Sequence, residues 1–159
     1  MSLQLTSPAF QDAEQIPAVF TCEGKDINPA LDWTGVPDGT VSLALIMEDP
    51  DVPRNIRPDG LFLHWIVWNI APTVTGIVED SPLIGMVGMN NAKQVGYRGP
   101  CPPKGSHRYY FRLYALDIEL LLPSTATKGD LLRAMDGHIL DQAELMGLYE
   151  KAHPETAEN

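Results

Sequence analysis

Glycine and proline recur along the whole chain and limit its fold more than any other feature. The 159 residues include 13 glycines and 14 prolines, about one residue in six, where average usage gives about 12%. Proline removes a backbone hydrogen-bond donor and glycine adds conformational entropy, so both interrupt helices. The sequence therefore excludes a helical bundle or coiled coil. It favours short strands joined by rigid turns within a single domain, 1–159.

Three apolar segments, 41–47, 61–70 and 108–116, are predicted to form the main strands. The longest, LFLHWIVWNI at 61–70, is almost continuously hydrophobic, which is typical of a strand covered on both faces. A fourth strand is expected where Leu31 and Trp33 alternate with polar residues. These segments predict a mainly β fold.

The rest of the chain alternates between turns and one predicted helix. Residues 71–107 are expected to form a long ordered loop or several short hairpins, and such a loop in a compact domain is usually functional. Residues 128–137 have the apolar spacing of a helix, with Thr125 or Thr127 as its N-cap. Segment 138–150 suits a helix by composition and a strand by alternation, so both remain open. Residues 152–159 are expected to be a frayed tail.

The chain is acidic, with a net charge of −10, which makes nucleic acid and anionic membranes poor partners. No apolar run approaches the roughly 20 residues of a membrane span. The N-terminus lacks a secretion signal, so a cytoplasmic location without membrane insertion is expected. Within 81–116 no acid occurs, which indicates either an anion-binding region or a chance gap in a strand-rich stretch; its basic residues are Lys93, Arg98, Lys104, Arg108 and Arg112.

Three features indicate a polar site. Asp49 and Asp51 lie in the proline-rich turn DPDVP, His64 interrupts an apolar strand, and residues 96–111 combine prolines and glycines with His107. Taken singly, the aspartates could cap local N–H groups, and His64 could be a core histidine with a satisfied hydrogen bond. Taken together, a carboxylate would raise the pKa of both imidazoles and favour their cationic forms. Such a site would bind phosphate, sulfate or a phosphorylated head group.

The motifs DPDVP, HWIVWN and GPCPPKGSHRYYFRLYAL, in this order and spacing, resemble the phosphatidylethanolamine-binding proteins, also called Raf-kinase-inhibitor-like proteins. Segments 20–33 and 137–149 resemble the prokaryotic YbhB/YbcL branch. The resemblance implies a Greek-key fold with a large antiparallel sheet, a smaller sheet and a short helix. It also implies a non-trans peptide near a small anion pocket, and no cofactor. The ligand-binding residues that it assigns are Asp49, Pro53, His64, Cys101, Pro102, Pro103, His107 and Tyr109.

Two further predictions concern the cysteines and the assembly. By themselves, Cys22 and Cys101 could be two buried thiols or one bridge. Because TCEG and GPCPP occur together in the resembling branch, their Cα atoms are predicted to lie within bridging distance, as free thiols in a reducing cytosol. An exposed apolar patch is expected in the loop 83–89, where it would contribute to a C2 homodimer; its apolar residues are Leu83, Ile84, Met86, Val87 and Met89.

The leading hypothesis is a non-enzymatic protein that binds a small anion, with no catalytic residue and no metal. A cysteine hydrolase using Cys101 and His107 is one alternative, although the flanking prolines leave few oxyanion donors. A zinc or iron site is another, on Asp49, Asp51, His64 and His107. A protease or kinase inhibitor is a third, in which an exposed loop, 79–95, would insert into the target enzyme.

Overall fold

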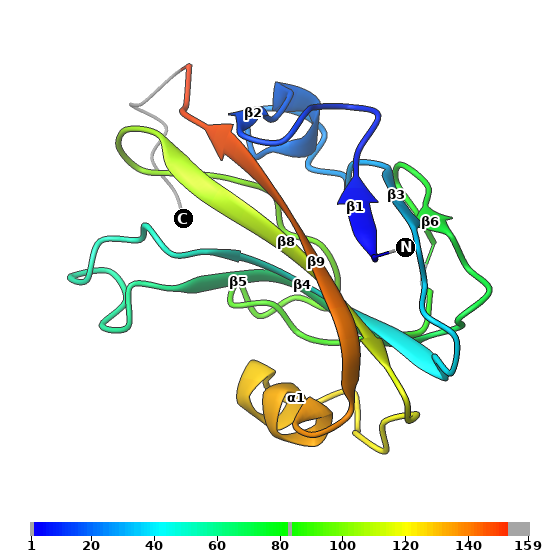
Figure 1. Ribbon diagram of the computed structural model, residues 1–159. Helices are drawn as coiled ribbons and strands as arrows, with labels where there is room; N and C mark the ends of the chain where they lie inside the picture. The colour runs from blue at the N-terminus through cyan, green and yellow to red at the C-terminus, as the bar shows by residue number, and fades with distance from the viewer. Residues whose placement is uncertain (1, 83, 153–159) are drawn as a thin grey trace.

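Two β-sheets face each other across a shared apolar core in the computed structural model, which describes residues 2–82 and 84–152 (Figure 1). The smaller sheet has the order β1-β3-β6, with β1 at Gln4–Thr6, β3 at Leu31–Thr34 and β6 at Gly76–Ile77. The larger sheet has the order β2-β9-β8-β4-β5-β7; its strands are β2 (Glu14–Gln15), β4 (Ser42–Asp49), β5 (Phe62–Ile70), β7 (Met86–Val87), β8 (His107–Leu116) and β9 (Ile139–Tyr149).

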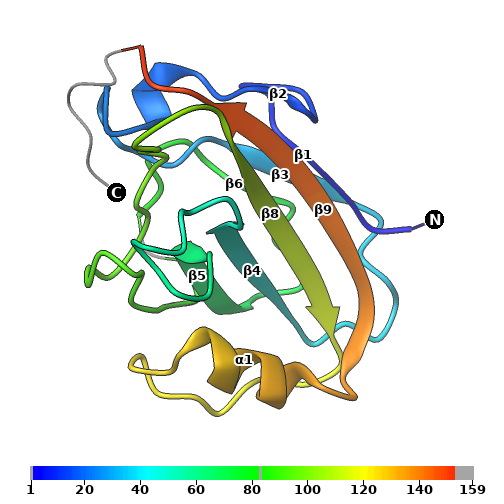
Figure 2. The ribbon, with the colours of Figure 1, turned by 90° about the vertical axis from the view of Figure 1, so that its left-hand side faces the viewer.

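Both faces of the larger sheet are covered, which explains why its central strands are so apolar. Leu45 and Met47 of β4 pack toward the smaller sheet, whereas Ala44 and Ile46 pack toward helix α1. Figure 2 shows α1 beside the large sheet, away from β1 and β3. The predicted strands at 41–47, 61–70 and 108–116 are confirmed as β4, β5 and β8. The predicted mainly β fold with two sheets and one short helix is therefore confirmed.

Helix α1 (Lys128–Met135) confirms the predicted helix and shows which threonine begins it. Thr127 Oγ1 accepts a hydrogen bond from the backbone N–H of Asp130, and the Asp130 carboxylate accepts one from the Thr127 N–H. This reciprocal capping box satisfies two N–H groups at the start of the helix. Gly137, with φ +80°, follows the helix end in a conformation that favours glycine. A 3-10 helix, η1 (Ala18–Phe20), precedes Cys22.

Segment 138–150, for which the sequence left helix and strand open, forms the strand β9. It pairs antiparallel with β8 from Ile139 opposite Leu116 to Tyr149 opposite His107. The short β2 pairs with the other edge of β9 in parallel, with Glu14 opposite Gly147, so the large sheet is not wholly antiparallel. Of the predicted tail, only residue 152 lies within the described residues.

The loop 71–107 contains β6, β7 and an isolated bridge between Met89 and Val95. The prediction of an exposed apolar patch at 83–89 is wrong for Val87. This residue pairs with Val67 of β5, and its side chain is only 9% exposed. Met89 is half exposed, and residue 83 lies outside the described residues. The described helices are all too short or too polar to cross a membrane.

Candidate functional site

A β-bulge in β5 determines where His64 points. Met47 of β4 lies opposite Trp65, but the next residue, Glu48, lies opposite Leu63, so His64 is the extra residue in β5. A bulge breaks the alternation of side chains and often redirects one near a functional site. His64 therefore faces the same side of the sheet as Trp65. Strict alternation would have placed the two residues on opposite faces.

Four buried polar side chains gather at this end of the larger sheet. They are Asp49 from β4, His64 from β5, and His107 and Tyr109 from β8, and none is more than 4% exposed. His107 Nδ1 donates to Asp49 Oδ2 over 2.6 Å. The rings of His64 and Tyr109 meet edge to face, with centroids 5.3 Å apart. The structure thus brings together the three residues from which the sequence predicted a polar site.

Asp51 supports this site from outside. Its backbone N–H donates to Asp49 Oδ1 over 2.7 Å, so both carboxylate oxygens of Asp49 accept hydrogen bonds. The Asp51 carboxylate accepts from the Arg108 side chain and from the Arg108 backbone N–H. The guanidinium lowers the pKa of Asp51. Asp51 therefore joins the end of β4 to the start of β8.

The protonation of His64 follows from its contacts. Its Nδ1 lies 2.6 Å from the Arg98 carbonyl oxygen, and because a carbonyl oxygen only accepts, Nδ1 must hold a proton. Burial lowers the pKa of His64 to about 4, with a smaller opposing effect of the Arg98 carbonyl. The ring is neutral at pH 7, so the predicted cationic form is wrong for His64. The charge of Asp49 does not offset the loss of hydration.

Two atoms of this cluster, His64 Nε2 and Tyr109 Oη, are buried without a hydrogen-bond partner among the described residues. Burial, followed by the charge of Asp49 and by the closeness of the phenol to that carboxylate, raises the pKa of Tyr109, so its phenol stays protonated. The contact of the phenol with Asp49 lacks the geometry of a full hydrogen bond. Phe62 covers His64 from another side, with ring centroids 4.7 Å apart. Buried polar atoms are nearly always hydrogen-bonded, so two unsatisfied atoms in one cluster need an explanation.

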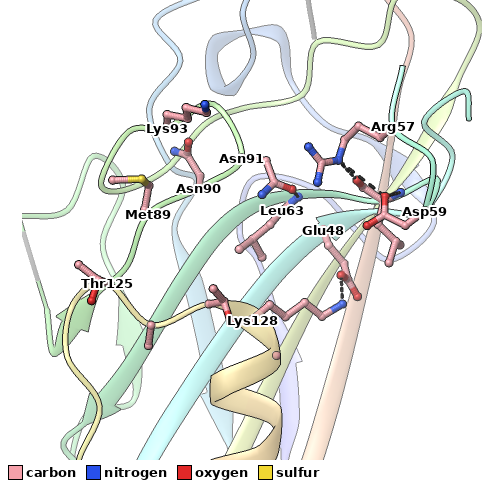
Figure 3. A pocket seen from close by; sticks show the side chains of 14 residues that line it. Glu48, Arg57, Asp59, Leu63, Met89, Asn90, Asn91, Lys93, Thr125 and Lys128 are labelled. Carbon is pink, nitrogen blue, oxygen red and sulfur yellow. Dashed lines mark hydrogen bonds and ion pairs between the residues drawn. The ribbon is translucent and has the colours of Figure 1, made fainter. Parts of the chain in front are cut away.

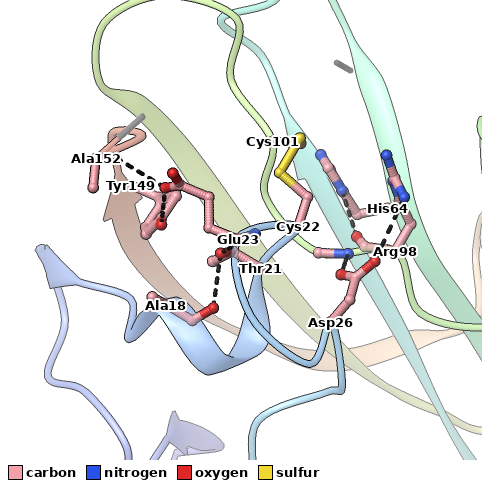
Figure 4. The surroundings of a disulfide bond; sticks show 11 residues. Ala18, Thr21, Cys22, Glu23, Asp26, His64, Arg98, Cys101, Tyr149 and Ala152 are labelled. Atoms are coloured by element: carbon pink, nitrogen blue, oxygen red, sulfur yellow. Dashed lines mark hydrogen bonds and ion pairs between the residues drawn. A yellow bond between two sulfur atoms is a disulfide. The ribbon is translucent and has the colours of Figure 1, made fainter. Parts of the chain in front are cut away.

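A disulfide joins Cys22 to Cys101 next to this cluster (Figure 4). Their Cα atoms are 5.4 Å apart, so the predicted proximity is confirmed, whereas the expected free thiols are wrong. The bond leaves Cys101 without a thiol for the nucleophilic role considered from the sequence. The same segment is held by Asp26, which accepts from the Gly99 N–H over 2.7 Å and pairs with Arg98 at 3.5 Å. These contacts fix the carbonyl that orients His64.

The remaining predicted site residues are prolines, for which no contact with the cluster is seen among the described residues. Pro102 is buried, Pro103 is half-buried, and Pro53 is half-buried in a turn where its carbonyl accepts from the Ile56 and Arg57 N–H groups. The non-trans peptide implied by the resemblance is not found, since the described residues contain no cis peptide bond. The described residues also contain no group of three or more candidate metal ligands.

Three of the five basic residues of the stretch 81–116 are paired with acids, whereas Lys93 and Lys104 are exposed to solvent. The arginines form ion pairs with acids from other parts of the chain, so their charge is largely compensated. The pairs are Arg98 with Asp26, Arg108 with Asp51, and Arg112 with both Glu48 and Glu144. A count of charges along the sequence misses these distant partners.

The largest described cavity lies on the opposite face of the large sheet (Figure 3). It has a volume of about 450 Å³, and its lining includes Glu48, Arg57, Leu63, Met89 and Lys128. Glu48 is buried there and paired with Lys128 and with Arg112. None of the three described cavities is lined by the Asp49 cluster. The four side chains of the predicted site are at most 4% exposed, so they are shielded from solvent in this structure.

Known proteins resemble this chain along almost its whole length. The sequence model of the phosphatidylethanolamine-binding protein family matches residues 6–150. A UPF0098 protein of Chlamydia muridarum is 50% identical, covering 94% of this chain and 99% of that protein. A UPF0098 protein of Methanothermobacter thermautotrophicus is 46% identical, with 94% and 99% covered.

Solved structures agree with the sequence matches. A putative phosphatidylethanolamine-binding protein homolog from Chlamydia trachomatis has a TM-score of 0.92 at 49% identity, covering 94% of this chain and 98% of that one. YbcL of E. coli, described as a member of the mammalian PEBP family, has a TM-score of 0.85 at 30% identity, with 95% and 99% covered. By sequence and by structure, the chain belongs to the phosphatidylethanolamine-binding protein family.

Proposed function

We propose that this protein binds a small oxyanion, such as phosphate or a phosphorylated head group, at the cluster of Asp49, His64, His107 and Tyr109, without catalysing a reaction. The observation that supports this proposal is the pair of buried atoms without partners, His64 Nε2 and Tyr109 Oη. Leaving such an atom unsatisfied costs about 1–3 kcal/mol. A bound oxyanion can satisfy both atoms if one oxygen accepts from the Tyr109 hydroxyl and a protonated oxygen donates to His64 Nε2.

Each side chain has a distinct part in this proposal. The Tyr109 phenol donates to an oxygen of the anion, because its raised pKa keeps it protonated. His107 is held at Nδ1 by Asp49, which leaves Nε2 for the ligand. Asp49 uses both oxygens within the protein and orients His107 rather than attacking a substrate. The non-enzymatic character is supported by this arrangement and by the bonded Cys101 sulfur.

Access to the site requires movement of a wall, since the four side chains are at most 4% exposed. We assign this wall to the rim of the proposed site, which consists of Cys101, Pro102, Pro103 and Pro53. The exposed residues 104–106 follow directly after this rim and precede His107. Anion binding is expected to shift this segment first.

Titration calorimetry with inorganic phosphate tests the proposal. The substitution His107→Ala is expected to weaken binding by about 1–3 kcal/mol, the loss of a charge-assisted hydrogen bond. His138→Ala is the matched control, because His138 is a solvent-exposed histidine paired with Asp117 outside the cluster. Absence of phosphate binding to the unmodified protein, or equal affinity of the His107→Ala variant, would overturn the proposal.

A homodimer and a cytoplasmic location are further parts of the proposal that rest on the sequence. Sedimentation at micromolar concentration tests the dimer, and a monomer there would contradict it.

Inhibition of a protease or kinase is the second candidate function. Its predicted loop, 79–95, is anchored through the buried Asn90, whose amide donates to the Gly96 carbonyl and accepts from the Ala92 and Gln94 N–H groups.

A further inference from the structure

The two nitrogens of His64 have opposite hydrogen-bonding roles. Nδ1 donates to the Arg98 carbonyl oxygen over 2.6 Å, and a neutral imidazole has only one N–H. The other nitrogen, Nε2, is therefore a lone-pair acceptor, and it is buried without a partner. A ligand atom that meets Nε2 must present a hydrogen.

The groups facing His64 keep this assignment fixed. Asp49 faces it from β4, His107 and Tyr109 face it from β8, and Arg98 faces it from the loop before β8. Asp49 accepts from His107 and from the Asp51 N–H, and it receives no hydrogen bond from His64, whose single N–H donates to the Arg98 carbonyl. Arg98 holds the ring through its backbone carbonyl, and its guanidinium pairs with Asp26. The Arg98 carbonyl cannot become a donor, so the ring cannot reverse these roles without losing its hydrogen bond.

An oxyanion without a proton does not suit this acceptor. Sulfate would place an oxygen lone pair against the Nε2 lone pair in a site shielded from water, where the repulsion is strong. Phosphate has at least one P–O–H group near neutral pH, which can donate to Nε2 while its other oxygens accept from Tyr109. We propose that this site selects oxyanions that bring their own O–H group, such as phosphate and the monoanions of phosphate monoesters, over oxyanions that have none.

Protonation of the His64 ring does not remove this preference for anions with an O–H group at neutral pH. Burial holds the pKa of His64 at about 4, so an anion that required the cationic ring would have to bring a proton from solvent at a large cost. In either arrangement one proton enters the site together with the anion. The proposal rests on the proposed oxyanion function and specifies the chemistry of the ligand.

Calorimetry at pH 7 with inorganic phosphate and with sulfate, at equal ionic strength, gives the first test. A site built to bond an O–H group discriminates strongly against analogues that lack it, so phosphate is expected to bind at least about 100-fold more tightly than sulfate. The variant His64→Gln presents an amide that can donate as well as accept. It is expected to bring the two affinities within about tenfold of each other, while His138→Gln, at the exposed histidine, keeps the unmodified ratio.

A second test uses the unmodified protein and does not depend on the folding of a variant. Methyl phosphate loses its only O–H above a second pKa of about 6, so its affinity is expected to fall about tenfold per pH unit above that value. Equal affinities for phosphate and sulfate, or a flat methyl phosphate profile, would overturn the selection while leaving oxyanion binding intact. If neither phosphate nor sulfate binds, the proposed function itself fails.

Discussion

Glu48 and Asp49 are neighbours in β4, yet they face opposite sides of the same sheet and have opposite surroundings. Glu48 lines the cavity of about 450 Å³ beside α1, where Lys128 and Arg112 neutralise it. Asp49 is fully buried and pairs with one histidine. It lies beside two polar atoms without hydrogen-bond partners, and it lines none of the three described cavities. The carboxylate of the larger opening has two basic partners, whereas the closed cluster keeps two buried polar atoms without a hydrogen-bond partner.

This contrast shows that the size of a cavity and the presence of polar atoms that lack hydrogen-bond partners are separate properties. An open pocket whose charges are already paired gains little from a polar ligand, because the ligand must compete with existing partners. A closed cluster with unsatisfied atoms gains hydrogen bonds as soon as a ligand reaches it. The Asp49 side of β4 is therefore the better candidate for ligand binding.

Substituting the two neighbouring carboxylates tests the contrast most directly. Asp49→Asn is expected to lower the free energy of unfolding by about 3 kcal/mol, since it removes the carboxylate that accepts hydrogen bonds from His107 and from the Asp51 N–H, and to weaken phosphate binding at least tenfold. Glu48→Gln is expected to cost only about 1 kcal/mol, because its partners are partly exposed to solvent. Its phosphate affinity should be unchanged. Denaturant titration and calorimetry measure both quantities, and equal effects of the two substitutions on phosphate binding would remove the distinction.

The pH dependence of stability provides a second test on the Asp49 side. The pKa of His64 is about 4 when folded, against 6.5 as its ordinary value, so below pH 6.5 the unfolded chain takes up a proton that the folded protein refuses. The His64 contribution is complete above about pH 6.5 and is lost progressively down to about pH 4. The loss amounts to about 3 kcal/mol.

Unfolding measured in buffers free of phosphate and sulfate isolates this contribution when the unmodified protein is compared with His64→Gln. Other carboxylates titrate in both proteins and cancel in the difference. A difference between the two proteins that stays constant from pH 7 to pH 4 would contradict the assignment of a neutral, buried His64.

Removing the disulfide tests how firmly the segment that orients His64 is held. The double substitution Cys22→Ala, Cys101→Ala is expected to lower the free energy of unfolding by about 2 kcal/mol, at the lower end of the usual range. Asp26 still holds Gly99 and Arg98 in that variant. Phosphate affinity should fall by a few-fold, and an unchanged melting temperature under reducing conditions would show that the bond does not stabilise the native protein.

The smallest expected effect lies on the α1 side. Thr127→Ala removes the N-cap of α1 and is expected to cost about 1 kcal/mol. Because α1 packs on the face opposite Asp49, phosphate affinity should not change. A loss of phosphate binding in this variant would mean that the two faces of the large sheet are energetically coupled.

The sequence predicted the strands well because burial on both faces leaves a strong apolar signal, as in β5. The motif order also placed Asp49, His64 and His107 at one site. Two features had no local signal, and a third had an ambiguous one. The bulge at His64 depends on the register against β4, and the charge compensation of Arg112 depends on Glu48 and Glu144. The alternation in 138–150 allowed a strand as well as a helix, and pairing with β8 decides for the strand β9. Each needs a partner that is distant in the sequence.

The parallel pairing of β2 with β9 has a consequence for the order of events during synthesis. Residues 14–15 emerge from the ribosome well before their partners at 147–148, which lie 133 residues further along the chain. Until then, β8 also lacks its neighbour along one whole edge. Pairings between segments so far apart in the sequence form slowly, and unpaired strand edges favour aggregation. We therefore expect the large sheet to close only after residues 139–149 have left the ribosome, and a nascent chain halted before residue 139 to depend on chaperones.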